Sequence, residues 1–244
     1  MALPPPLRAL GIGEFNAPHS LEMYLDYLCP FSNKQLQGVY EHLLPLIFEP
    51  SSPYYGKVRI ILRPYPQPWH SSAPILAEAA LAIARLAEPS GKNAVEETNN
   101  LVDPKLNAFW VFSREVMKNQ EAYFDGPSRT KNPDQIRGDF VNLAVATLGE
   151  QPKREKGKPL VKSHERGMPL GQAVKNLVRV EPEGNAGSAV APDLKYCVKI
   201  GRQNGIHVTP TMIWNGLVEP SISSSYGEKE WKDFLEKHIG GGQK

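Results

Sequence analysis

The sequence predicts an α/β fold with a long helical insertion, and three stretches of the 244-residue chain carry that prediction. A strand, a helix and a second strand follow one another between residues 20 and 63. Helical patterns then fill most of residues 74–180, and a strand and an amphipathic helix follow between residues 205 and 239. Strands separated by helices are typical of a sheet that carries helices on its faces.

The first unit begins with SLEMYLDYL (residues 20–28), which is aromatic and alternating enough to form a strand. Apolar residues then recur at helical spacing from Pro30, and this helix should falter at Pro45. The β-branched stretch KVRIILR (57–63) predicts the second strand, parallel to the first across a right-handed connection. We expect residues 1–19, with three consecutive prolines, to form an N-terminal tail.

The middle of the chain is predicted to be helical. PILAEAALAIARLAE (74–88) is alanine-rich and amphipathic, and residues 104–124 place large apolar side chains along one helical face. Residues 132–149 have the same period between a helix-capping start and a terminal glycine. A weaker helix is expected at 168–180, followed by a small-residue loop at 181–192.

The last part of the chain returns to a strand. A helical segment ends at Gly205, and strand signals follow at GIHVTPTMIWNG (205–216). The apolar face of that helical segment comprises Leu194, Cys197, Val198 and Gly201. In the final amphipathic helix, Ser225 and Glu228 match a capping box.

The stretch LDYLCPFSNKQ (25–35) carries the strongest candidate for chemistry. Cys29 ends the predicted strand and begins the predicted helix, where free N–H groups and the helix dipole favour a thiolate. Pro30 suits the first helical position, and Ser32 lies one turn further on, close enough to donate a hydrogen bond to the sulfur. The alternative is a buried structural cysteine at a strand end.

A second feature, VTPTMIW (208–214), places Pro210 inside a strand-like run. A proline is tolerated there only at an edge, at a strand start or after a cis bond. The Cys-Pro helix start and this Thr-Pro strand entry together resemble the thioredoxin fold, and the helical block between the second and third strands resembles its DsbA-like branch. The resemblance implies a cis Thr209–Pro210 bond facing Cys29, with the Thr209 backbone free to pair with an extended peptide or glutathione.

The same resemblance divides the chain into domains. It implies a discontinuous thioredoxin-like domain formed by residues 20–71 and 195–240. Residues 72–194 would form an inserted helical domain that matches the DsbA-like branch in kind and size rather than in motif.

Ser32 stands where dithiol members of this superfamily carry their second cysteine. An intramolecular disulfide at this site is therefore excluded, and single-thiol chemistry remains, with a mixed disulfide that an external thiol releases. Cys-Pro-Phe-Ser resembles the site of monothiol glutaredoxins, which implies glutathione as the second thiol. We expect Cys29 and Ser32 to be the catalytic residues and glutathione a co-substrate, with no tightly bound cofactor.

Two other interpretations remain open. Kappa-class glutathione transferases and 2-hydroxychromene-2-carboxylate isomerases share the inserted helices, and DYLCPFS resembles their site with Cys29 in place of a serine. In that case Cys29, assisted by Ser32, would stabilise a bound glutathione thiolate. The third interpretation is a non-catalytic binding module, since fold does not determine function.

The remaining site predictions concern residues around the cysteine. The residues expected to contact the substrate are Pro30, Phe31, Thr209, Pro210, Trp69 and His70. Cys197 is expected to be a core residue, with a role as a distant resolving thiol the less favoured alternative. The six histidines show no metal-binding spacing, so no metal site is predicted.

The composition of the chain limits the classes of partner that we expect. A net charge of +2 predicts no nucleic-acid partner, and no apolar run is long enough to span a membrane. Only two cysteines, 168 positions apart, and no signal-like start favour a cytoplasmic protein. We expect a partner that is glutathione or a protein thiol or disulfide; a homodimer remains open.

Overall fold

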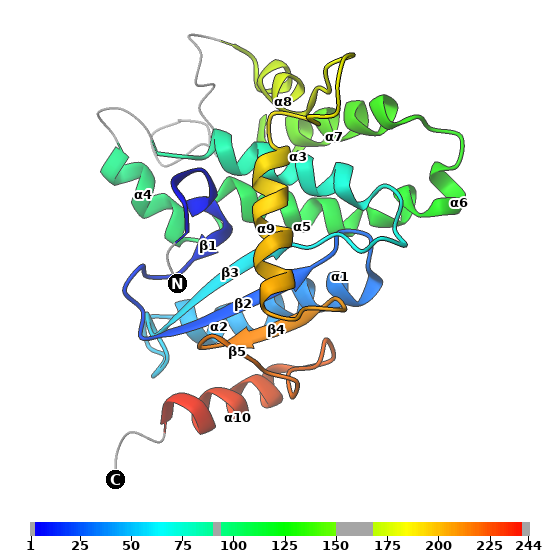
Figure 1. Ribbon diagram of the computed structural model, residues 1–244. Coiled ribbons are helices and arrows are strands. Elements are labelled where there is room, and N and C mark those ends of the chain that lie inside the picture. The colour runs from blue at the N-terminus through cyan, green and yellow to red at the C-terminus, as the bar shows by residue number, and fades with distance from the viewer. Residues whose placement is uncertain (1–2, 90–93, 150–167, 241–244) are drawn as a thin grey trace.

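A five-stranded mixed sheet runs through the computed structural model, which describes residues 3–89, 94–149 and 168–240 (Figure 1). The strands are β1 (Gly11–Ile12), β2 (His19–Leu25), β3 (Val58–Pro64), β4 (Thr211–Trp214) and β5 (Leu217–Val218). Their spatial order is β1-β3-β2-β4-β5. The central pair β2–β3 is parallel, and every other neighbouring pair is antiparallel.

The parallel pair confirms the predicted strand–helix–strand unit, but its helix does not stop at Pro45. α1 (Pro30–Gly38) continues through one π-helical segment, η2 (Val39–Leu43), into α2 (Leu44–Phe48). Pro45 lies in the first turn of α2, where a missing N–H is tolerated. The wider π turn therefore resets the hydrogen-bond register just before the proline, and the chain remains helical.

Helices predominate among the described residues between β3 and residue 180, as expected. They are α3 (Ala73–Leu86), α4 (Ala94–Val102), α5 (Ala108–Lys118), η4 (Gln120–Tyr123), α6 (Asp125–Ser128), α7 (Pro133–Gly149) and α8 (Leu170–Val178). The helix predicted from residue 104 begins only at Ala108, because the Asn107 side chain caps it by accepting from the N–H groups of Phe109 and Trp110. α3 packs against α5, α7 and α8, and is buried over most of its length.

The N-terminal segment is part of the fold, so its prediction as a tail was wrong. Prolines start a short 3-10 helix, η1 (Pro5–Leu10), and β1 then pairs with β3 through Gly11–Ile61 and Ile12–Ile60. Three apolar side chains of the segment are almost completely covered; they are Leu7, Leu10 and Ile12. The indole N–H of Trp110 donates to the Leu10 carbonyl at 3.1 Å, which ties η1 to the helices.

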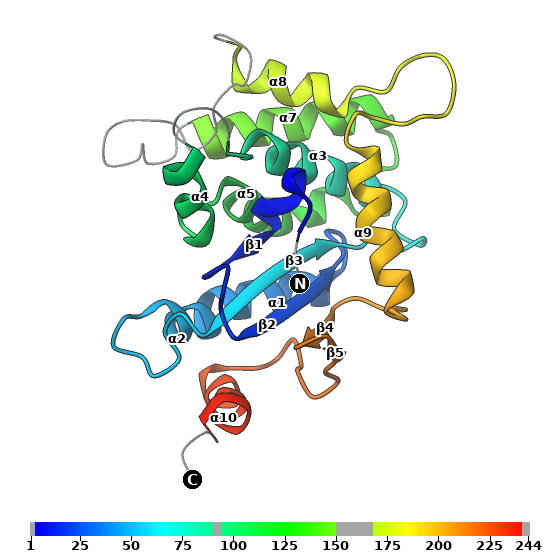
Figure 2. The ribbon, with the colours of Figure 1, turned by 60° about the vertical axis from the view of Figure 1, so that its left-hand side comes forward.

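α9 (Ala191–Gln203) crosses one face of the sheet, while α1 and α2 lie against the other (Figures 1 and 2). The strand expected from residue 205 is confined to β4, after Pro210. α10 (Glu228–Ile239) begins at the cap residue Gly227, whose N–H donates to Glu230. The predicted Ser225–Glu228 capping box was therefore wrong; the Ser225 hydroxyl instead accepts a hydrogen bond from Lys34.

Within the described ranges, no helix is long and apolar enough to cross a membrane.

Candidate functional site

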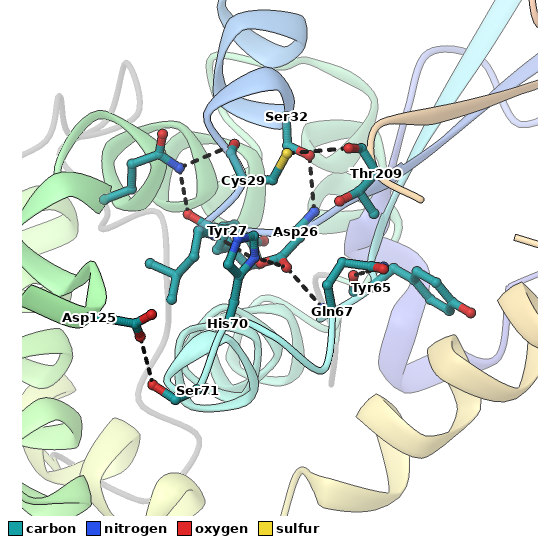
Figure 3. A network of polar contacts seen from close by, with 12 residues as sticks. Asp26, Tyr27, Cys29, Ser32, Tyr65, Gln67, His70, Ser71, Asp125 and Thr209 are labelled. Carbon is teal, nitrogen blue, oxygen red and sulfur yellow. Dashed lines mark hydrogen bonds and ion pairs between the residues drawn. The ribbon is translucent and has the colours of Figure 1, made fainter. Parts of the chain in front are cut away.

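Cys29 lies where the sheet, the first helix and the late strand meet (Figure 3). It is the N-cap residue of α1, with Pro30 at the first helical position, as the sequence predicts. Its thiol donates a hydrogen bond to the carbonyl oxygen of Thr209 at 3.2 Å. The sulfur thus adjoins both the first turn of α1, whose free backbone N–H groups carry partial positive charge, and the partial negative charge of the Thr209 carbonyl oxygen.

The Thr209–Pro210 peptide bond is cis and directly precedes β4. β4 pairs with β2, so the loop before it is held beside the end of β2, from which the chain turns toward Cys29. The hydroxyl of Thr211 donates to the Val208 carbonyl at 2.7 Å and closes this loop. The Thr209 hydroxyl is buried and has no hydrogen-bond partner in the described part of the chain. The structure therefore brings Cys29, Thr209 and Pro210 together.

The thiol of Cys29 is less accessible to solvent than expected for a reactive cysteine. Only 6% of Cys29 is exposed, although Pro30 on its N-terminal helix turn is open to solvent. Exposed apolar side chains occur around the site: Phe31 is 65% exposed, Trp69 60% and Val208 59%.

Ser32 is completely buried in the first turn of α1. Its hydroxyl oxygen accepts a hydrogen bond from the backbone N–H of Asp26 at 3.2 Å. No hydrogen bond joins this hydroxyl to Cys29 in the structure, so a bond from Ser32 to the ionised sulfur stays a prediction. What the hydroxyl does here is to fasten the helix start to the end of β2.

Asp26 is a candidate residue that the sequence argument did not single out. Its carboxylate is fully buried, and Oδ1 accepts from the N–H of Leu28 at 2.9 Å. Oδ2 accepts from the N–H of Gln67 at 2.9 Å and contacts Nδ1 of His70 at 2.6 Å. One feature of the sequence could have identified Asp26: it is an acidic residue among apolar residues at the end of the predicted strand. A carboxylate buried there requires hydrogen-bond donors from elsewhere in the fold.

His70 is held by the turn that follows β3. Its N–H donates to the Gln67 carbonyl at 3.1 Å, and its own carbonyl accepts from Ala73 at the start of α3. The side chain is 24% exposed and reaches Asp26, as Figure 3 shows. Trp69, its neighbour, is directed into solvent, and its indole lies edge-on to the imidazole at 6.2 Å. The structure thus attaches His70 to the turn before Cys29.

Cys197 lies in the core, on α9, with none of its surface exposed. Burial raises the pKa of its thiol to about 12. A thiol that stays protonated at neutral pH is a poor nucleophile, and both cysteines are free. This environment fits the structural role predicted for Cys197.

No cluster of three or more histidine, cysteine or acidic side chains able to hold a metal occurs among the described residues.

No family model matches the chain, and no curated protein matches it in sequence. Solved structures do match along almost its full length. DsbA from Chlamydia trachomatis is 16% identical with a TM-score of 0.58, and covers 96% of this chain and 93% of its own. A provisionally assigned protein-disulfide isomerase from Pseudomonas syringae is 21% identical with a TM-score of 0.57, covering 93% and 97%. BdbD from Bacillus subtilis, in its oxidised form, is 16% identical with a TM-score of 0.53, covering 95% and 93%.

At these identities the similarity concerns architecture alone. The mixed sheet, the helix that begins at Cys29 and the helices between β3 and α9 occur in the order expected from the sequence. The protein therefore has a DsbA-like thioredoxin fold.

Proposed function

We propose that this protein is a thiol–disulfide oxidoreductase that acts through the single thiol of Cys29. The observation that carries the proposal is the position of this sulfur, at the N-cap of α1 and 3.2 Å from the carbonyl of Thr209. Partial positive charge at the helix N-terminus stabilises the thiolate that must attack a disulfide or leave from one. The structural relatives support the proposal, because they are named as DsbA, BdbD and a protein-disulfide isomerase.

The reaction has two steps. The Cys29 thiolate attacks a disulfide of a substrate or of glutathione, one sulfur leaves as a thiolate, and a mixed disulfide remains on Cys29. Because Ser32 cannot form the second bond, an external thiol attacks the mixed disulfide and releases Cys29 again. Glutathione is the proposed external thiol. The Ser32 hydroxyl still has its hydrogen to donate, and we expect it to turn toward the Cys29 thiolate.

Substrate would lie along the loop before β4. Phe31 and Trp69 offer exposed apolar surface, and the buried hydroxyl of Thr209 offers an unpaired polar group. Apolar contacts of this kind suit an extended protein segment that carries a cysteine. Protein thiols or disulfides are therefore proposed as substrates beside glutathione.

The test is incubation with glutathione disulfide, followed by peptide mass spectrometry. We expect glutathione on Cys29 but not on Cys197, and its removal by reduced glutathione. The Cys197→Ser protein should behave like the wild type, while Cys29→Ser should take up none. Failure to modify native Cys29, when the unfolded protein is modified readily, would refute the proposal.

A second candidate function is a binding module in which Cys29 has no redox role. The low exposure of Cys29, 6%, favours this second function. Alkylation of Cys29 in the native protein separates the two functions. If the Cys29–Thr209 contact opens, a small reagent such as iodoacetamide and a bulky maleimide will both label native Cys29. If it stays closed, neither will, and Cys29→Ala will retain every binding partner.

A further inference from the structure

The Asp26–His70 pair lies next to the proposed catalytic thiol but has no part in the two steps described above. Asp26 is fully buried, and its three hydrogen-bond donors are two backbone N–H groups and the His70 imidazole. The backbone N–H groups of Leu28 and Gln67 join Asp26 to the turn before α1 and to the segment after β3. The third contact, 2.6 Å from Nδ1 of His70, places a titratable side chain beside the carboxylate.

The contact with Asp26 engages Nδ1 of His70 and leaves Nε2. When the carboxylate of Asp26 is ionised it can only accept, so Nδ1 then carries the hydrogen of this bond. In the neutral imidazole this places the free lone pair on Nε2.

His70 also borders a cavity of about 230 Å³. The other residues that line it are Leu28, Pro30, Phe124 and Asp125. Pro30 follows Cys29 directly, so the cavity adjoins the start of α1. Since Nδ1 is turned to Asp26 and the side chain is 24% exposed, Nε2 is the nitrogen that remains for a group in this cavity.

We propose that His70 is the general base that activates the external thiol in the second step, and that Asp26 is its positioning residue. This inference rests on the proposed single-thiol function of Cys29. A small aliphatic thiol enters the cavity, and its S–H gives its proton to Nε2 of His70. The new thiolate attacks the substrate-side sulfur of the mixed disulfide, and the bond to Cys29 breaks. Cys29 leaves as a thiolate and takes the proton back from the imidazolium.

The step is balanced. The entering thiol and the bound sulfur become a disulfide, Cys29 returns to its reduced form, and one proton passes from the entering thiol through His70 to Cys29. The titratable groups placed against His70 in the described structure are Asp26, which contacts its Nδ1, and Asp125, which lines the same cavity. Asp125 is held by the Ser71 hydroxyl at 3.1 Å.

General-base help matters only for a thiol that still carries its proton. An aliphatic thiol with a pKa near 8.5 is about 3% ionised at pH 7, so a base can accelerate it by at most about 30-fold. An aryl thiol that is already ionised at pH 7 gains nothing from the base. Comparison of the two therefore separates proton transfer from a merely structural role of the pair.

The experiment starts from protein with glutathione on Cys29 and measures its release at pH 7 by quenched-flow mass spectrometry. We expect His70→Gln to slow release by 2-mercaptoethanol by about 10- to 30-fold, while release by an ionised aryl thiol changes by less than about twofold. Asp26→Asn should slow the aliphatic thiol selectively as well. His42→Gln, which alters a histidine in η2 outside the cavity, should leave both rates unchanged.

Equal slowing with both thiols would show that His70 only supports the local structure, and no slowing with either would show that it is not the base. Either result overturns the inference while the single-thiol function stands. If His70→Gln does not fold, the wild-type protein still decides: relative to reaction with glutathione disulfide in free solution, release by 2-mercaptoethanol should be accelerated more than release by the aryl thiol, and equal acceleration overturns the inference. Failure to form the mixed disulfide at all would remove the proposed function itself.

Discussion

The buried hydroxyl of Ser32 accepts a hydrogen bond from the backbone N–H of Asp26 at 3.2 Å. This bond joins the first turn of α1 to the end of β2, on the two sides of Cys29. The residue that removes dithiol chemistry from the site thus also holds the turn that carries the remaining thiol. Changes at Ser32 should consequently affect both the chemistry and the local stability.

Ser32→Cys should give the site an intramolecular disulfide. Residues three apart in a helix start have Cα atoms about 5 Å from each other, within the range that a disulfide spans. We expect mild oxidation to remove two free thiols per chain, and glutathione to be expelled from Cys29 by the new thiol. Thiol titration and intact-mass measurement report both results. Ser32→Ala provides the control, since it has no second sulfur; retention of both thiols in Ser32→Cys would contradict the expectation.

Asp26→Asn should destabilise the protein by about 1–3 kcal/mol. The amide can still accept from Leu28, but its NH₂ group would face the N–H of Gln67, which would lose its buried partner. Urea denaturation measures the change in the free energy of unfolding. Asp233→Asn removes an exposed carboxylate that pairs with Lys229 on α10, and should change stability by less than about 0.5 kcal/mol. Equal effects of the two substitutions would argue against a structural role for Asp26.

Cys197 should make the protein lose stability in alkali. Burial raises the pKa of its thiol from 9.0 to about 12, so between these values the unfolded chain releases a proton that the folded chain keeps. The folded state then binds more protons, and the free energy of unfolding falls as pH rises, at up to about 1.4 kcal/mol per pH unit. The loss disappears well below pH 9, where the thiol is protonated in both states.

The measurement compares wild type with Cys197→Ala by urea denaturation at pH 9 and pH 10. The substitution leaves a small cavity that lowers stability equally at both pH values. Between pH 9 and pH 10, the free energy of unfolding of the wild-type protein should fall by about 1 kcal/mol more than that of Cys197→Ala. Parallel pH dependences would show that the thiol ionises as readily in the folded protein as in the unfolded chain.

Gly201→Ala should destabilise the protein by about 1–3 kcal/mol. A Cβ at this position in α9 would lie 2.3 Å from Cε2 of Tyr65, whose hydroxyl is bonded to the Ile206 carbonyl at 2.9 Å. The ring cannot move away without breaking that bond, which anchors the chain just before the Thr209 loop. Gly138→Ala in α7 is the matched control, because its Cβ meets nothing within 4 Å. That substitution should stabilise the helix by up to about 1 kcal/mol, and destabilisation by both would contradict the packing argument.

Sequence patterns and the resemblance together predicted the main helices and strands of the fold and a candidate site at Cys29. Alternating and 3.6-residue patterns identify β2, α1, β3, α3, α7 and α10, because these elements bury one face against the sheet or against one another. The cysteine before a helix-starting proline and the late Thr-Pro pair point to Cys29, Thr209 and Pro210 without any knowledge of distance. The prediction of an N-terminal tail failed because the consecutive prolines suggested an irregular segment. They instead begin a short 3-10 helix whose leucines are buried in the core.

Only the tertiary structure decided which polar groups of the site contact one another. The 3.2 Å contact between Cys29 and Thr209 joins residues 180 positions apart, and Asp26 meets His70 across 44 positions. Patterns along a chain report which face of an element is buried, but not which polar groups meet after two elements pack. Such contacts determine the low exposure of Cys29, the hydrogen-bond partner of Ser32 and the position of Asp26. They form because a buried polar group requires a hydrogen-bond partner, and the packing of the sheet and helices decides which partner is within reach.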